Sequence, residues 1–598
     1  MSEEIRPEVI SSIFDENGQL IPALRDKEYF LFDAYGVFWD GSKLIQATVE
    51  DMQRLVALGK KVCVVSNTTE LSSAAQKKYK QRAINSGFLI PYTVEEMIEL
   101  AKSKETIKTK DETGKDKPIE DIIREAKVLG IIPENITTFK EPISLNNVLK
   151  AADLKLIEYP TRRKIVELLI CKNKLPSLEK GIEEAKELRL IPQDTEVKNL
   201  DLPVNKDCLE EIKEMNLMKD FFGEFITSGD VFREAVSNGS LQEQIEGQRV
   251  DKLKEKGKIK VYIFGNPRKE LFKDSNFDIV NTPKEANCVY LSIPSLTKTQ
   301  VIKAVLLNLG LSQEELKQWE GYIQLVEKLE NTAWKMSLER IFNDIGSKLT
   351  KVQKGKLEQL KTYFQKSSLT KPGEPERWDV IEDHQEIFYP FLNEFMSSGL
   401  PILNANPDCS APEKNAENPK QTHNVVRNGA LTEYITKEGG TVFEYGKPNV
   451  EIFECALKLL DKEYKRKLES LKALELRLKN IEQSQALSAP KQEEGGKSED
   501  KFTEPEVLKQ RTVLLEQAKA AKEEAEKTQT EIKKDVMDKT VMVGDTPRTD
   551  GGIKKLGGTF ICPSTGNGEK YAEEEGRGTN ADYFLHRIAK VSTEVRTR

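Results

Sequence analysis

The residues of this chain best suited to do chemistry are acidic side chains that directly follow short apolar runs. Asp33 follows the run Tyr29–Phe32 in FLFDAYGVFWDG, and Asp545 and Asp550 follow a second apolar run in TVMVGDTPRTDGG. Each pattern predicts a short buried strand that ends in carboxylates at a glycine-containing turn, where open α/β sheets build their sites. Such a carboxylate can attack a phosphorus or carbon centre as a nucleophile. The alternative interpretation is a turn or helix-capping residue, since Asp is common in both places.

The same carboxylates have the chemistry of a magnesium site. Mg²⁺ takes oxygen ligands and usually binds one or two carboxylates together with water and phosphate oxygens. Asp33 and Asp545 meet this requirement, and Asp550 and Thr546 are placed to orient the ligands without binding the metal themselves. We therefore predict Mg²⁺ as the cofactor.

Two further motifs indicate that the site handles phosphate. Ser66 and Asn67 end the apolar run KVCVVSN and precede a predicted helix, where a hydroxyl and backbone N–H groups would hold a phosphate. Lys447 lies between Gly446 and Pro448, two residues that restrict the local backbone. An ammonium group there would neutralise charge on a transferring phosphoryl group and keep the nucleophile ionised. A solvated surface lysine is the alternative interpretation.

The elements that must position these residues form a βαβ unit near the N-terminus. We expect a strand ending at Asp33, a helix over about 48–58, a strand over 61–67 and a helix over 72–85. A right-handed crossover would place the two strand ends side by side. Asp33 and Ser66 are therefore predicted to be neighbours.

The chain of 598 residues is too long for one ordinary core. Charged, helix-like sequence follows the first unit, and an α/β pattern resumes near residue 222 before a second helix-rich block. We therefore predict that the chain belongs to the α/β class and contains helical insertions. We predict that α/β sequence lies in three parts, residues 1–90, 401–456 and 537–598, separated by an insertion over 91–400 and by a helical hairpin over 457–536; as set out below, the family that the motifs resemble implies that 91–400 is a cap domain.

The predicted hairpin has the spacing of a coiled coil. Apolar residues alternate in steps of three and four, and a second helix follows a polar, glycine-containing linker. The hairpin is either a solvated spacer or an arm that docks a protein partner or self-associates. The expected contact residues are Leu457, Leu460, Tyr464, Leu471, Leu474, Leu478 and Ile481 of the first helix, and Leu508, Leu515, Ala518, Ala525 and Ile532 of the second.

Composition excludes several classes of function. Charged residues make up 32% of the chain and the net charge is −7, so no overall basic field would attract nucleic acid. No apolar stretch approaches the roughly 20 residues of a membrane span, and the acidic N-terminus lacks a signal-peptide pattern. Seven dispersed cysteines without a C-x-x-C pair indicate reduced thiols, and three histidines without H-x-x-x-H disfavour zinc. We expect a cytoplasmic protein without nucleic-acid or membrane partners.

Taken together, these motifs resemble the haloacid dehalogenase-like (HAD) superfamily, class IIA, which includes nitrophenylphosphatase-type enzymes. Four motifs match in order: Asp33 in FDAYGVFWDG, Ser66 in VVSNT, Lys447 in YGKPN, and the acidic pair in GDTPRTD. The segments ITSGD (226–230) and NANPD (404–408) match further features of this class. The resemblance covers about half of the chain, and the helical blocks and the hairpin have no counterpart in it.

The resemblance implies a Rossmann-like parallel sheet with an α/β cap domain inserted between the Ser66 and Lys447 motifs. It implies that Asp33 forms an aspartyl-phosphate and that Mg²⁺ bridges Asp33 and Asp545, with the backbone carbonyl of Tyr35 as a further ligand. The cap would select a phosphorylated small molecule. By motif position, the candidate substrate contacts are Asp230, Asp408 and Arg427.

Tyr35 departs from the family pattern, which has an aspartate at this position as general acid and base. A phenol with a pKa near 10 is a poor base at neutral pH, and loss of such a group costs about 10²–10⁴-fold in rate. Tyr35 or a residue of the cap would then have to act as the catalytic substitute, so the prediction of a hydrolase stays open. The alternatives are a phosphatase of modest rate, a weakly active or inactive binding protein, and a hydrolase acting at carbon such as a dehalogenase.

Overall fold

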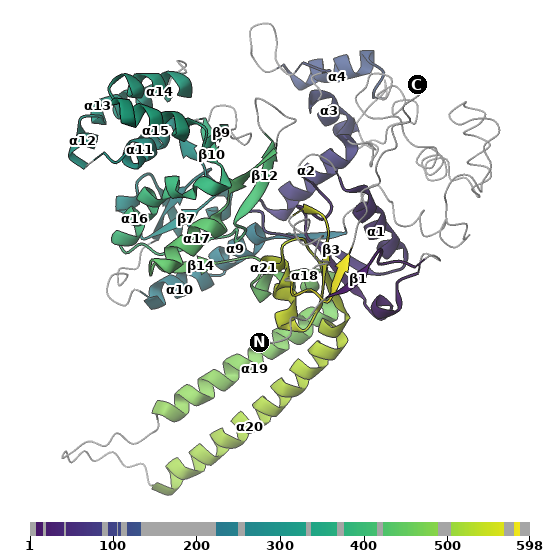
Figure 1. Cartoon of the computed structure of the whole chain (residues 1–598). Helices are drawn as coiled ribbons and strands as arrows, with labels where there is room; N and C mark the ends of the chain where they lie inside the picture. Colours follow the sequence, from purple (N-terminus) through teal and green to yellow (C-terminus); the bar gives the residue numbers. More distant parts are fainter. Residues whose placement is uncertain are drawn as a thin grey trace, which may run out of the picture. The chain divides into compact units, whose positions relative to one another are not determined.

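The computed structural model of the chain divides into two compact units (Figure 1). Unit 1 comprises Met1–Asp33, Lys60–Val65 and Lys447–Arg598, and unit 2 comprises Ala34–Gly59 and Ser66–Gly446. The residues that the structure describes are 7–15, 19–40, 44–85, 94–103, 106–108, 117–132, 223–248, 258–311, 313–330, 337–366, 376–414, 422–487, 504–566 and 579–585.

Unit 1 is built on a parallel sheet. Its strands lie in the order β1-β17-β16-β15-β2-β3, and every pairing among them is parallel. All residues of β2 and β15 are buried, as expected for central strands with both faces covered. The strands are β1 (Glu8–Ile10), β2 (Tyr29–Phe32), β3 (Lys61–Ser66), β15 (Thr540–Val543), β16 (Thr559–Pro563) and β17 (Tyr583–Leu585).

The register of this sheet determines where its polar strand ends lie. Phe32, the last residue of β2, pairs with Val543 of β15 on one side and with Val64 of β3 on the other. Parallel strands in this register end at the same edge of the sheet. The predicted α/β fold with a Rossmann-like parallel core is therefore confirmed.

Unit 2 contains a second parallel sheet, in the order β14-β11-β7-β5-β6. The cap was predicted to end at residue 400, whereas β11 and β14 lie beyond that point and pair within this sheet; unit 2 runs to Gly446. The strands are β5 (Ile259–Phe264), β6 (Phe277–Val280), β7 (Cys288–Leu291), β11 (Ile402–Asn404) and β14 (Val442–Glu444), preceded in the chain by β4 (Glu224–Thr227).

Helices and small sheets complete unit 2. An antiparallel sheet β8-β10-β9 and a two-stranded ribbon β12-β13 accompany the helical insertions. The predicted helix at 48–58 is α1 (Gln46–Ala57), and the predicted helix at 72–85 is α2 (Ser72–Asn85). The other elements are α3 (Val94–Ser103), α4 (Ile119–Val128), α9 (Ser228–Ser237), α10 (Ser240–Gln248), β8 (Leu296–Thr297), α11 (Lys298–Asn308), α12 (Gln313–Lys317), α13 (Glu320–Glu330), α14 (Leu338–Ser347), α15 (Lys351–Lys361), β9 (Phe364–Lys366), β10 (Arg377–Val380), α16 (Tyr389–Ser397), β12 (Ser410–Lys414), β13 (Thr422–Val426) and α17 (Asn428–Lys437).

In unit 1, α18 (Val450–Leu460) leads into a helical hairpin, here called the arm. It consists of α19 (Lys462–Leu487) and α20 (Glu504–Asp535), which pack along each other (Figure 1). Tyr464, Leu468, Leu471 and Leu474 of α19 form a buried cluster with Ala521, Ala525 and Ile532 of α20. Helical insertions of the kind predicted are therefore present.

The predicted contact residues of the arm need correction in places. Leu457 and Leu460 belong to α18, because the backbone leaves the helical conformation at Asp461, but both pack with the buried cluster of the arm as predicted. Leu515 is 55% exposed, and Leu514 lies closer to the contact instead. The prediction is wrong by one residue on α20. The contact face follows alternating steps of four and three through residues 514, 518, 521 and 525, whereas residue 515 lies on the neighbouring face of the helix. The side chain of Leu508 lies outside the described residues. Among the described helices, none combines the length and the apolar character of a membrane span.

Candidate active site

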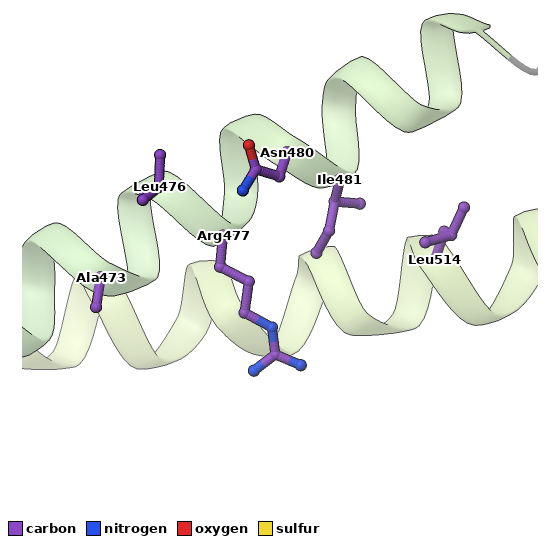
Figure 2. Close-up of a pocket in the computed structure, with 6 residues that line it drawn as sticks. All are labelled: Ala473, Leu476, Arg477, Asn480, Ile481 and Leu514. Carbon is purple, nitrogen blue, oxygen red and sulfur yellow. The ribbon is translucent and has the colours of Figure 1, made fainter.

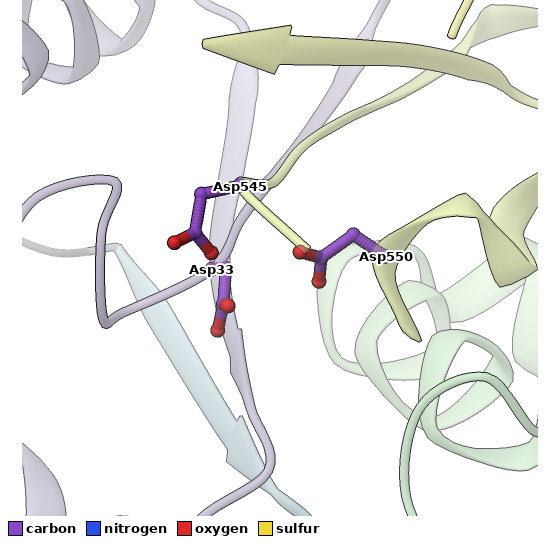
Figure 3. A group of neighbouring side chains, drawn as sticks. All are labelled: Asp33, Asp545 and Asp550. Atoms are coloured by element: carbon purple, nitrogen blue, oxygen red, sulfur yellow. The ribbon is translucent and has the colours of Figure 1, made fainter. Parts of the chain in front are cut away.

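The candidate active site forms where β2 and β15 end. Asp33 directly follows β2, and Asp545 follows β15 after a single glycine. Because Phe32 and Val543 are paired neighbours, both carboxylates emerge at one edge of the sheet. One carboxylate oxygen each from Asp33, Asp545 and Asp550 lies within 4.8 Å of the other two, and all three residues are buried (Figure 3). The structure thus brings together the acidic residues that the sequence singled out.

A short helix holds Asp550 in this group. Thr546 precedes α21 (Pro547–Asp550), and its backbone N–H donates to Asp550 Oδ2 at 2.9 Å. Its hydroxyl also donates to Asp545 Oδ1 at 3.1 Å. Thr546 therefore links the two C-terminal carboxylates and restrains their orientation.

Lys447 supplies the positive charge beside the carboxylates. Its Nζ lies 2.7 Å from Asp33 Oδ1 and 2.6 Å from Asp550 Oδ1, and the residue has no exposed surface. A buried ammonium needs such partners, because an unpaired charge in the protein interior is very unfavourable. The solvated-surface interpretation of Lys447 is therefore wrong.

Two glycines, neither of which the sequence analysis had assigned a role, make this packing possible. A Cβ on Gly544 would lie 2.1 Å from Cγ of Asp550, and one on Gly552 would lie 2.6 Å from the carbonyl oxygen of Pro448. Gly544 thus leaves room for the Asp550 carboxylate, and Gly552 lets the Lys447-Pro448 turn approach closely. Both glycines flank the acidic motif, so the sequence marks their position. Only the contacts in the structure show that they make room for Asp550 and for the Lys447-Pro448 turn.

The electrostatics of the group follow from its burial. Burial raises the pKa of Asp550 to about 7; Lys447 acts in the opposite direction, and the neighbouring charge of Asp33 adds to the rise. The three carboxylates therefore hold more negative charge than one lysine offsets. An all-oxygen donor set with excess negative charge fits Mg²⁺, so the residues present suit the predicted metal.

The other predicted site residues belong to unit 2. Ser66 is buried at the end of β3, and the buried Asn67 donates from its amide nitrogen to Asp408 Oδ1 at 2.9 Å. A Cβ on Gly446 would lie 2.6 Å from Asn67 Oδ1, and Gly446 adopts a φ of 105°. The structure thus brings Asn67 and Asp408 together and fits Gly446 closely against Asn67.

Tyr35 lies in a charged environment of unit 2. Burial raises the pKa of its phenol, the carboxylate of Glu413 adds to this effect, and the guanidinium groups of Arg82 and Arg427 oppose it. Arg427 Nη2 donates to Glu413 Oε1 at 2.6 Å. Neither Arg82 nor Glu413 was singled out in the sequence, because no local motif marks them.

Asp230 is engaged in local structure. Its Oδ2 accepts from the backbone N–H of Thr227 at 3.0 Å and from the hydroxyl of Thr227 at 2.8 Å, completing a capping box at the start of α9. Both carboxylate oxygens also lie 3.1 Å from the backbone N–H of Ser72. These contacts favour a structural role for Asp230 over a substrate contact.

The parallel sheet and its buried carboxylates define an α/β protein with a hydrolase-type site at the ends of its strands. Residues 30–113 match the sequence model of the haloacid dehalogenase-like hydrolases. The predicted family resemblance is therefore confirmed. None of the curated protein sequences matches the chain.

Several solved structures are similar to the chain at low sequence identity. A haloacid dehalogenase-like hydrolase from Brucella suis shares 11% identity at a TM-score of 0.33, with 95% of this chain and 97% of that chain covered. A p-nitrophenyl phosphatase from Archaeoglobus fulgidus shares 10% identity at a TM-score of 0.28, with 94% and 96% covered. A 4-nitrophenylphosphatase from Thermotoga maritima shares 11% identity at a TM-score of 0.29, with the same coverage. The family resemblance rests on the sequence match over residues 30–113.

Proposed function

We propose that this chain is a Mg²⁺-dependent phosphatase that acts on a phosphorylated small molecule through an aspartyl-phosphate at Asp33. The observation that carries the proposal is the position of Asp33 in a buried group with Lys447, Asp545 and Asp550. A nucleophilic carboxylate next to a buried ammonium and two further carboxylates is what phosphoryl transfer to Asp requires.

The residues of unit 1 have separate tasks in this proposal. An oxygen of Asp33 attacks the phosphorus, and the bond between phosphorus and the leaving oxygen breaks with its electron pair going to that oxygen. Lys447 offsets the charge on the phosphoryl oxygens and keeps Asp33 ionised. Asp33, Asp545 and the Tyr35 carbonyl would hold Mg²⁺, with Thr546 and Asp550 orienting them. The bound cation would supply further charge stabilisation to the phosphoryl group.

The leaving oxygen needs a proton, and hydrolysis of the aspartyl-phosphate needs a base. Tyr35 stands where the family has an aspartate, and burial keeps its phenol protonated at neutral pH. A protonated phenol can donate to the leaving group but is a poor base for water. We therefore expect the aspartyl-phosphate to form faster than it is hydrolysed.

The same observation supports a second candidate function. If no other residue activates water, the chain binds a phosphorylated ligand with little turnover and acts as a binding protein. Hydrolysis at carbon, as in a dehalogenase, is a third and weaker candidate. In each case we propose Ser66 and Asn67 as phosphate-binding residues, and Asp408 and Arg427 as candidate contacts to the remainder of the molecule.

The test is turnover of p-nitrophenyl phosphate with and without Mg²⁺. We expect slow hydrolysis that requires Mg²⁺ and disappears in Asp33→Asn. Asp538→Asn, which removes an exposed acidic residue of unit 1, is the matched control and should retain full activity. Binding of vanadate without turnover would favour the binding protein. Halide release from a 2-haloacid, added as a separate substrate without Mg²⁺, would favour the dehalogenase.

A further inference from the structure

The arm carries an apolar groove that its own two helices leave open. Its lining comes from Ala473, Leu476, Arg477, Asn480 and Ile481 of α19 and from Leu514 of α20, around a cavity of about 330 Å³ (Figure 2). In Figure 2, Ile481 points toward α20, whereas Leu476 points away from it. The groove thus continues the contact between α19 and α20, and the side chains that line it leave it open.

Exposed apolar side chains surround the groove. Leu476 is 60% exposed, Leu515 is 55% exposed and Val513 is 45% exposed. A single exposed leucine needs no explanation, but a cluster beside an apolar groove marks an interaction surface. The base of the arm differs, because there Tyr464 and Leu468 are buried.

The charges of the arm indicate what kind of surface would cover the groove. α19 has seven basic and four acidic residues, whereas α20 has seven basic and eight acidic residues. An α19 surface is therefore complementary to an α20 surface. A second arm in antiparallel orientation offers both, with its α20 against α19 and its α19 against α20.

The size of the arm also suits a second copy. With 26 residues, α19 is about 39 Å long. Two helices, each about 10 Å across, then present a face of roughly 800 Å², which is the area that a standard protein interface buries on each partner.

We propose that the groove is covered by the arm of a second copy of this chain, so that two arms form an antiparallel four-helix bundle. The two-fold axis passes beside the groove, and each copy contributes the same residues, as in other symmetric dimers. Leu476 and Leu515 of each copy pack into the apolar groove of the other. This inference does not depend on the proposed catalytic function.

The first test is sedimentation of the full chain over a wide dilution series. We expect a dimer for the natural sequence and a monomer for Leu476→Glu combined with Leu515→Glu, with an unchanged circular dichroism spectrum that shows the variant to be folded. Leu459→Glu is the matched control, because Leu459 is 47% exposed on α18, outside the groove, and should leave the dimer intact. A natural chain that stays monomeric at every concentration, or a double variant that still dimerises, overturns the proposal.

A charge exchange tests the antiparallel pairing. Arg477→Glu with Lys479→Glu reverses exposed charges on α19, and Glu516→Lys with Glu523→Lys reverses exposed charges on α20. Each variant alone should dimerise at least tenfold more weakly, and mixing the two should restore a heterodimer. Equal dimerisation of all variants, or no recovery on mixing, contradicts the pairing of α19 with α20 across the interface.

Discussion

Lys447 and Asp33 form a buried ion pair, with 2.7 Å between Nζ and Oδ1, although 414 positions separate them in the chain. The pair exists because the Lys447-Pro448 turn approaches closely where Gly552 leaves room for it. The same ammonium binds Asp550 at 2.6 Å, so one cation serves two acidic residues.

Replacing Lys447 by Met should therefore damage both stability and activity. Breaking a buried ion pair by removing one partner typically costs about 3–5 kcal/mol, because the remaining charges stay buried without compensation. We expect a loss of stability of that order in chemical denaturation and a fall in turnover of at least about 10²-fold. Lys462→Met, at an exposed position of α19, is the control. Retained activity in a folded Lys447→Met protein would show that the ammonium has no part in the chemistry.

Gly544→Ala tests whether the Asp550 carboxylate must lie where it does. The added Cβ would approach Cγ of Asp550 to 2.1 Å, so either the carboxylate or the backbone has to move. We expect a cost of about 1–3 kcal/mol and weaker Mg²⁺ binding. Gly355→Ala is the control, since a Cβ there meets nothing within 4 Å and should stabilise the helix α15 by about 0.5–1 kcal/mol. If Gly544→Ala and Gly355→Ala changed the free energy of unfolding equally, the close packing of Gly544 against Asp550 would be contradicted.

Tyr35→Asp should restore the general acid and base that the family pattern includes. If the rest of the site is competent, we expect p-nitrophenyl phosphate turnover to rise about 10²-fold, the lower end of the range that such a group supplies. Tyr35→Phe removes the phenolic proton instead and should lower the rate. A flat response to both substitutions in folded protein would mean that residue 35 is not involved in proton transfer.

The site shows how far the sequence could predict this structure. Asp33, Asp545 and Lys447 could be singled out, because each combines a chemically apt side chain with a local pattern of apolar run and turn. Glu413 and Arg82 could not be found, because their significance comes from packing around Tyr35 rather than from neighbours in the chain. Helix bounds such as those of α2 followed directly from the residue pattern.

The arm shows the opposite limit. A spacing of three and four residues predicted two helices that contact each other, but it assigned Leu515 instead of Leu514 to the contact face of α20. The choice depends on which face packs against Leu471 and Leu474, and a single helix does not contain that information. The break at Asp461 was missed because the apolar spacing continues across it.

Asp379 of β10 predicts a pH dependence of stability in unit 2. Burial raises the pKa of its carboxyl to about 7 from an ordinary value of 3.8, Arg427 opposes the rise and Glu413 adds to it. Because the folded-state pKa is the higher one, the stabilising proton is fully bound below pH 4 and is lost as the pH rises through 7. Between pH 4 and pH 7, the contribution of this proton to the free energy of unfolding falls by about 1.4 kcal/mol per pH unit.

Asp379→Asn should remove this dependence. As the pH rises from 5 to 8, the melting temperature of the variant should rise relative to that of the natural chain. Asp383→Asn, an exposed position nearby in the chain, should show a constant difference. A difference for Asp379→Asn that does not change with pH would show that this carboxyl is ionised in the folded protein.

Asp461 should determine how firmly the arm is attached to the sheet. Its Oδ1 accepts from the backbone N–H groups of Glu463 and Tyr464 at the start of α19, at 2.8 and 3.0 Å. Its Oδ2 accepts from the Tyr29 hydroxyl at 2.5 Å and from Lys61 Nζ at 2.6 Å, and these two residues belong to β2 and β3. One carboxylate thus caps the helix and joins it to two strands.

Two substitutions separate these roles. Asp461→Asn keeps a good helix cap but loses the charge, so we expect a cost of about 1 kcal/mol for an ion pair that is partly exposed. Asp461→Ala loses both, which should cost about 2–3 kcal/mol and expose the start of α19 to faster amide hydrogen exchange. Exchange measured residue by residue locates the effect. If Asn and Ala destabilise equally, or if exchange rises throughout α20 but not at the start of α19, the carboxylate does not act as the cap that anchors the arm.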